Sequence, residues 1–163
     1  MPWYAVNTKP QHECVAELSL QKLGVETFYP QLMQRKVIRR RAETRIGPLF
    51  PRYLFARFPL DTHYRAVTYA RGVRNIVTFG TMPATVEDEI IEGIRARLHD
   101  GYLTVPAPSF MPGEIIRIQT GPLQGLEAVF VREMSDHERV VLLLRTLTYQ
   151  ARVVLPVEQV VNT

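Results

Sequence analysis

The chain has 163 residues, of which 46% are hydrophobic, so it can form one large domain or two small ones with ordinary cores. No apolar run approaches the roughly 20 residues of a membrane span, and the N-terminus, MPWYAVNTKP, lacks the pattern of a secretion signal, so we expect a cytoplasmic protein without membrane contact. The formal charge of +4 is uneven: residues 1–100 carry 15 Lys and Arg against 10 Asp and Glu, and residues 101–163 carry 5 against 6.

The first predicted elements alternate in type. Residues 3–6 favour a short strand, and Pro10 can open a helix with an apolar stripe that Gly24 would end. Residues 25–29 are typical of a second extended segment.

A dense basic run follows. Its six cations are opposed by one acid, Glu43, and the segment around Val37 and Ile38 is expected to form a hairpin with residues 52–58, its basic tip projecting from the sheet. Such a run is usually a solvated face, but at this density an anionic partner, most commonly nucleic acid, is an equal alternative. The cations are Arg35, Lys36, Arg39, Arg40, Arg41 and Arg45.

The segment 47–58, GPLFPRYLFARF, has more apolar surface than one buried face of a strand can use. Alternation sends Leu54 and Phe58 to one face, which we expect in the core, and Tyr53, Phe55 and Arg57 to the other. Together with Phe50, these aromatics predict a surface for a partner. The alternative is that an internal helix or sheet covers them.

Two further helices and a strand complete the first part. A helix is expected over 61–69, capped by Asp61 or Thr62, and a strand over 74–79. Thr85 and Asp88 have capping-box spacing before a helix whose apolar stripe is Ile90, Ile91, Ile94 and Leu98. The predicted class is α+β, with helices packed on a mainly antiparallel sheet.

A proline- and glycine-rich stretch at 100–113 predicts a linker. We therefore expect domains at 1–100 and 113–163, joined by a linker at 101–112. The second domain favours five short strands, which would curl into a small barrel: EIIRIQT, LEAVFVRE, VVLLLRTL, ARVVLP and VEQVV. Residues 138–146 also suit a helix, because their three consecutive leucines do not alternate with polar residues.

Signatures of catalysis and metal binding are not found in the sequence. Cys14 has no disulfide partner, the four histidines lack metal-ligand spacing, and the serines lack the glycines of a nucleophile elbow. We expect no enzyme, metal or cofactor. Gly121, Pro122 and Gly125 indicate a tight turn, either a plain strand connection or part of a binding module.

Four motifs occur in an order that resembles the NusG family of transcription elongation factors. They are WYAVNTKP, GPLFPRYLF, YARGVRNIVTFG and PGEIIRIQTGPLQGLEAVF, and together they span nearly the whole chain. The last, with the turn at 121–125, resembles the KOW motif of the family's C-terminal domain. PLFPRYLF and ERVVLLLRTL are most similar to the specialised RfaH branch, in which that domain rests as an autoinhibitory helical hairpin and refolds into a barrel.

The resemblance implies contacts with RNA polymerase. Phe50, Tyr53 and Phe55 match the apolar patch that binds the polymerase clamp. His63, Tyr64 and Arg65 match a triplet that touches the gate loop, of which only His63 is identical.

The resemblance also implies DNA binding. Lys9, His12 and Arg71 would contact the non-template strand, and the hairpin with Arg39, Arg40 and Arg41 would lie near the upstream duplex. Because arginine can bind base edges as well as phosphates, Arg71 is the candidate for sequence recognition.

The implied function is transcription elongation and antitermination by a monomer that suppresses pausing and termination. Its KOW domain would recruit a small-subunit ribosomal protein, and so couple transcription to translation, in preference to the termination factor Rho. The RfaH branch closes partly through a salt bridge between an acid and an arginine. The arginine matches Arg139, whereas the acid's position holds Gly47.

Two alternatives remain open. One is a housekeeping NusG that recruits Rho, and the other is a free-standing RNA- or ribosome-binding protein without affinity for polymerase.

Overall fold

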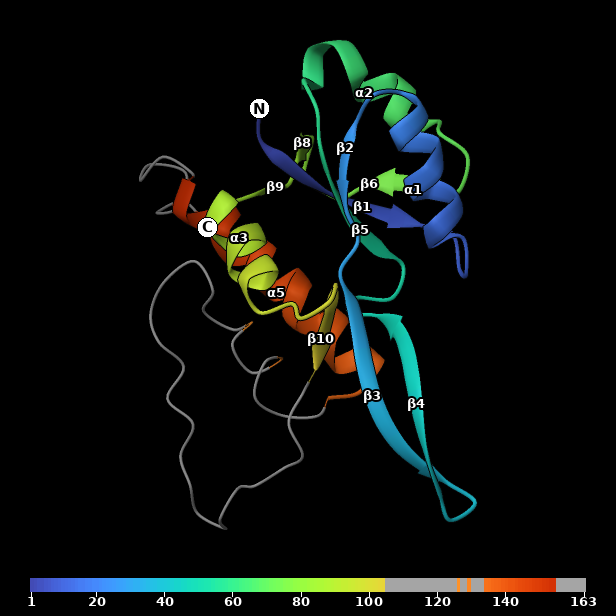
Figure 1. Cartoon of the computed structure of the whole chain (residues 1–163). Coiled ribbons are helices and arrows are strands. Elements are labelled where there is room, and N and C mark those ends of the chain that lie inside the picture. Colours follow the sequence, from blue (N-terminus) through green and yellow to red (C-terminus); the bar gives the residue numbers. More distant parts are fainter. Residues whose placement is uncertain (105–125, 127–128, 130–133, 155–163) are drawn as a thin grey trace.

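The computed structural model describes residues 1–104, 126, 129 and 134–154. Its centre is an antiparallel sheet in the order β2, β5, β1, β6, with β9 also paired to β1 (Figure 1). The strands are β1 (Trp3–Thr8), β2 (Glu26–Phe28), β5 (Tyr53–Arg57), β6 (Val73–Ile76) and β9 (Thr85–Val86). The expected strands at 3–6 and 25–29 are confirmed.

The two faces of this sheet carry separate apolar clusters. Alternation along β1 sends Tyr4 and Val6 to one cluster and Trp3 and Ala5 to the other. The sheet is therefore the middle layer of the fold and needs a cover on each face.

Helices α1 (Glu13–Lys22) and α2 (Leu60–Thr68) cover the first face. Ala16 and Leu20 of α1 and Val67 of α2 are fully buried in the same cluster as Tyr4 and Val6. Both helices were predicted, but their starts differ. Pro10 lies outside α1, and Pro59, not Asp61 or Thr62, is the N-cap of α2, because its extended backbone directly precedes the first turn.

Helix α3 (Asp88–Ala96) covers part of the second face. Its predicted stripe is confirmed, since Ile90, Ile91 and Ile94 are buried and Leu98 packs against them. The predicted capping box is wrong: Thr85 belongs to β9, and Glu87 is the N-cap, without a side-chain hydrogen bond.

A long hairpin extends from the body of the protein (Figure 1). Strands β3 (Gln31–Ile38) and β4 (Arg41–Pro48) pair along their whole length, and β10 (Tyr102–Thr104) pairs parallel with the base of β3. The predicted pairing with residues 52–58 is wrong, because β5 lies between β1 and β2. Strand β10 lies within the expected linker, and Leu103 is buried in the second cluster.

The expected strand at 74–79 is divided between β6 and a small hairpin. Thr78–Phe79 (β7) pairs with Met82–Pro83 (β8).

The described end of the chain is a helix, α5 (Asp136–Val154). Strands were expected over VVLLLRTL and ARVVLP. The first lies wholly within α5, as do residues 151–154 of the second, so the strand prediction is wrong there. The helical alternative holds for the residues for which it was made, 138–146. Leu143 and Leu147, one turn apart on the same face of α5, are both buried in the second cluster. Residues 155–156, EIIRIQT, VEQVV, the turn at Gly121, Pro122 and Gly125, and the expected strand LEAVFVRE apart from Leu126 and Val129 lie outside the described residues.

Candidate functional site

The aromatic patch, defined as Phe50, Tyr53 and Phe55, lies on the second face of the sheet. Phe50 and Phe55 are 1% and 0% exposed, and Tyr53 is half-buried. The Phe55 ring stacks on Phe28 and meets Phe50 edge-on, both with ring centroids 6.1 Å apart. The expectation of an open surface is therefore wrong for this structure, and the alternative, an internal cover, is what the fold contains.

The cover comes from two sources. One is α3, through its isoleucines. The other is the C-terminal cover, defined as Leu126, Val129, Met134 and α5, whose buried residues join the same cluster as Phe50 and Phe55. Figure 1 shows α5 beside α3 and β10. A segment at least 70 residues away in sequence thus completes the core over the patch.

Arg139 fastens the C-terminal cover. The residue is 3% exposed, yet its guanidinium donates to the Leu49 carbonyl oxygen at 2.7 Å, the Met134 carbonyl oxygen at 2.5 Å and the Asp136 carboxylate at 2.5 Å. A buried cation is tolerated only when its donors are satisfied in this way. The bond to Leu49 links α5 to the aromatic patch, because Leu49 is the residue before Phe50.

Two arginines lie over other aromatic rings of the cluster that contains the patch. The guanidinium of Arg57 lies 5.2 Å from the Trp3 ring centroid and pairs with Glu26 at 2.5 Å. That of Arg95 lies 5.0 Å from the Phe28 ring centroid and pairs with Glu92 at 3.0 Å. Sequence reasoning placed Arg57 on the aromatic face by alternation but gave Arg95 no role, since nothing local connects α3 with Phe28.

The basic corner, defined as Lys9, His12 and Arg71, forms at the other end of the sheet. The Lys9 backbone amide donates to the Gly72 carbonyl oxygen at 2.9 Å. Gly72 has φ +85°, and a Cβ there would lie 2.8 Å from the Ala16 nitrogen and 3.0 Å from the His12 carbonyl oxygen. This close approach of two loops brings the three predicted residues together, all of them exposed.

The hairpin tip carries the other predicted cations. Arg39 and Arg40 connect β3 and β4 with φ of 52° and 65°, the conformation of a two-residue type I′ turn. Arg39, Arg40 and Arg41 are all exposed. They are far along the hairpin from the sheet, so the tip and the basic corner are separate basic surfaces (Figure 1).

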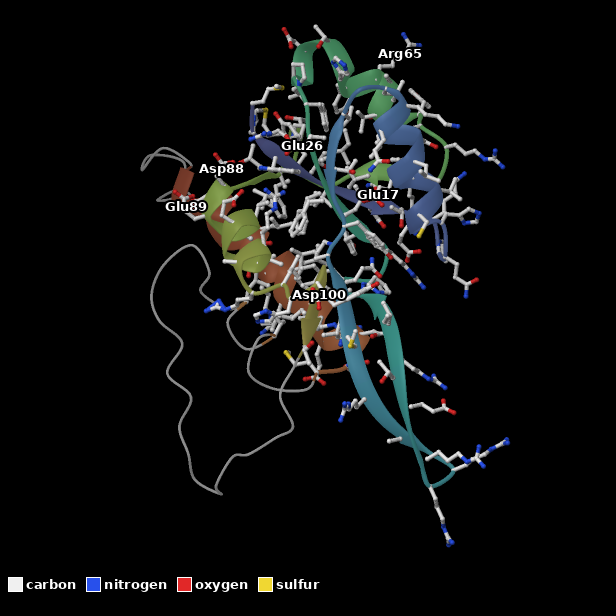
Figure 2. The ribbon with its side chains drawn as sticks, in the orientation of Figure 1. Glu17, Glu26, Arg65, Asp88, Glu89 and Asp100 are labelled. Atoms are coloured by element: carbon white, nitrogen blue, oxygen red, sulfur yellow. The ribbon has the colours of Figure 1, made fainter. Side chains whose placement is uncertain are left out.

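The predicted triplet His63, Tyr64 and Arg65 lies on α2. Figure 2 shows Arg65 projecting from α2 away from the sheet. Tyr64 is exposed, and half-buried His63 has its Nδ1 2.7 Å from the Thr62 hydroxyl oxygen. Tyr64 and Arg65 are therefore accessible to a partner, whereas His63 is half-buried and hydrogen-bonded to Thr62.

The described residues lack both the side-chain grouping of a metal site and a helix suited to cross a membrane. Within them, no group of three His, Cys, Asp or Glu side chains could hold a metal ion. No helix there is both long and apolar enough to cross a membrane.

The comparisons with known proteins come from sequence and structure. A family model described as transcription termination factor NusG matches residues 1–95. A solved structure described as domain interaction in Thermotoga maritima NusG is similar, with 23% identity and a TM-score of 0.43, covering 76% of this chain and 75% of that one.

Proposed function

Because this chain belongs to the NusG family of transcription factors, which is not a family of enzymes, we propose that it binds RNA polymerase during elongation through the aromatic patch. The observation that carries the proposal is the composition of the patch. Phe50, Tyr53 and Phe55 form one aromatic cluster whose lid is partly a separate C-terminal segment. Removing that segment would expose adjoining aromatic and aliphatic side chains, which is the composition of an interface core.

The C-terminal cover acts as an autoinhibitory lid in this proposal. It occupies the patch through Leu143 and Leu147 and is fastened by Arg139 on Leu49. Since the RfaH-type acid is replaced by Gly47, a backbone carbonyl accepts from the arginine instead. The released segment would adopt the KOW barrel, with its turn at Gly121, Pro122 and Gly125, and recruit a small-subunit ribosomal protein.

DNA binding belongs to the two basic surfaces. The basic corner would hold the exposed non-template strand, with Arg71 reading base edges, and Arg39, Arg40 and Arg41 would lie on the upstream duplex. The triplet His63, Tyr64 and Arg65 would touch the gate loop. A factor held at these points keeps polymerase closed on DNA, which suppresses pausing and termination without covalent chemistry.

The experiment compares two phenylalanines from opposite faces of the sheet. Phe55→Leu and Phe58→Leu both shrink a side chain that is at most 1% exposed, so both should destabilise the fold similarly, by about 1 kcal/mol. We expect Phe55→Leu to weaken binding to a reconstituted bacterial elongation complex about tenfold, and Phe58→Leu to leave it unchanged once the folded fraction is matched.

A second pair of variants tests the lid. Arg139→Ala should strengthen binding to the elongation complex, because it releases the contact with Leu49. The control Lys22→Ala removes an exposed cation on α1, on the other face of the sheet, and should change binding little.

Equal loss of binding in Phe55→Leu and Phe58→Leu would contradict the proposal that the aromatic patch binds polymerase. Weaker binding by Arg139→Ala would contradict the proposal that the C-terminal cover is an autoinhibitory lid. Capture of Rho by the chain would favour a housekeeping NusG.

A further inference from the structure

Tyr69 is an exposed aromatic residue beside the basic corner. Of the aromatic side chains that the structure describes, only Tyr64 and Tyr69 are exposed, at 43% and 79%. A single exposed aromatic residue needs no explanation by itself. Tyr69, however, lies next to the cations of the basic corner, and this position suggests a binding role.

Backbone hydrogen bonds fix where Tyr69 lies. It is the C-cap of α2, and the Val73 amide donates to the Ala70 carbonyl oxygen at 3.1 Å, which folds residues 70–73 into a tight turn. Gly72 of this turn is the residue that accepts the Lys9 amide and meets His12. Tyr69 therefore stands two residues from Arg71, at the same corner of the protein as Lys9.

The charge at this corner is available to an anion. Among the residues that the structure describes, neither Lys9 nor Arg71 forms an ion pair. The neighbouring acid, Glu13, accepts the Arg52 backbone amide at 3.1 Å. An exposed ring flanked by unpaired cations is the arrangement that binds single-stranded nucleic acid, with phosphates on the cations and a base on the ring.

We propose that Tyr69 is a stacking platform for one unpaired base of single-stranded DNA, whose phosphates lie on Lys9 and Arg71. The inference rests on the DNA-binding part of the proposed function and adds a contact with the flat face of a base. A duplex buries those faces between its base pairs, so the platform selects single strands. The C-terminal cover lies on the opposite face of the sheet, and the full chain can bind in its closed state.

The test uses two probes of equal charge. The first is an oligothymidylate of about 12 nucleotides, a length within the span of one such surface, and the second is an abasic oligodeoxynucleotide of the same length. For the full chain, Tyr69→Ala should weaken binding to oligothymidylate about tenfold and leave binding to the abasic strand unchanged. Tyr69→Phe should keep wild-type affinity, because it keeps the ring.

Two further variants separate the possible failures. Arg71→Gln should weaken binding to both probes, and Met82→Ala, which removes a side chain of similar exposure elsewhere, should weaken neither. If Tyr69→Ala has no effect, or weakens both probes equally, stacking is overturned while DNA binding stands. If the wild-type chain binds neither probe, the DNA-binding part of the proposed function fails, and this inference fails with it.

Discussion

Arg139 joins α5 to the segment before the aromatic patch without an acidic partner at position 47. Gly47 offers no carboxylate, yet the Leu49 carbonyl two residues later accepts from the same guanidinium at 2.7 Å. Charge-assisted bonds to a backbone oxygen do not depend on the side chain at that position. The closed arrangement is therefore compatible with glycine at 47, which the sequence comparison alone treated as a missing half of a salt bridge.

Gly72 is the residue on which the basic corner depends. Gly72→Ala should lower the free energy of unfolding by about 2 kcal/mol or more, because the added Cβ would meet the Ala16 backbone at 2.8 Å in a left-handed conformation. Gly24→Ala is the control: its φ is +77°, but nothing lies within 4 Å of the added Cβ, so about 1 kcal/mol is expected. Urea denaturation measures both, and equal losses would contradict the close approach of the two loops.

Tyr29 makes stability depend on alkaline pH. Burial, aided by the nearby charge of Glu13, raises the pKa of Tyr29 to about 12, from 10.0. Between pH 10 and 12 the unfolded chain loses this proton while the folded chain keeps it, so stability should fall as pH rises through that window. Tyr29→Phe removes the titration. Denaturation at several pH values should give a shallower decline for the variant, and parallel declines would contradict the assignment.

At the scale of elements, the β3–β4 hairpin combines strain with charge. Arg39 and Arg40 both have positive φ, where asparagine and glycine are favoured in a type I′ turn. Arg39→Asn with Arg40→Gly should raise the free energy of unfolding by about 1 kcal/mol. It should also weaken duplex DNA binding and reduce the slope of log affinity against log salt by about 2.

A charge removed elsewhere is the control for the hairpin. Lys22→Gln, in the last turn of α1, should leave the duplex salt dependence unchanged. An unchanged slope for the Arg39 and Arg40 double variant would place the duplex elsewhere, whatever its effect on stability.

Elements with a clear local period could be predicted from the sequence. The isoleucines of α3 and the alternation of β1 each define a buried face without further information. Strand β4 was missed because residues 41–46 are all exposed and contain only two apolar residues, Ala42 and Ile46. Strand β10 was missed because three residues carry too little pattern. The residues of the patch and corner could be named, but their covering and their grouping depend on contacts between distant segments.

The strand predictions for residues 140–147 and 151–154 failed for a related reason. Their Val, Leu and Thr residues suit strands by propensity, but Leu143 and Leu147 are buried on one helical face against the sheet. Tertiary packing thus decides the local structure of this segment, and loss of that packing would remove what favours the helix. This dependence is the physical basis for treating α5 as a lid.

At the scale of the whole molecule, the two faces of the sheet are covered by different parts of the chain. One face is covered by α1 and α2, and the basic corner and the triplet His63, Tyr64 and Arg65 lie on this side of the sheet. The other face buries the aromatic patch under α3 and the C-terminal cover. The proposed DNA-binding surfaces are therefore accessible in the closed protein, whereas the proposed polymerase contact requires the cover to leave.

The most direct measurement follows α5 during binding. Leu18 on α1 and Arg145 on α5 are exposed, so Leu18→Cys and Arg145→Cys, with Cys14→Ser, accept a pair of dyes for resonance energy transfer. We expect efficient transfer in the isolated chain and a fall in efficiency when an elongation complex is added. Binding with unchanged transfer would show that α5 stays in place and would contradict the claim that polymerase occupies the aromatic patch.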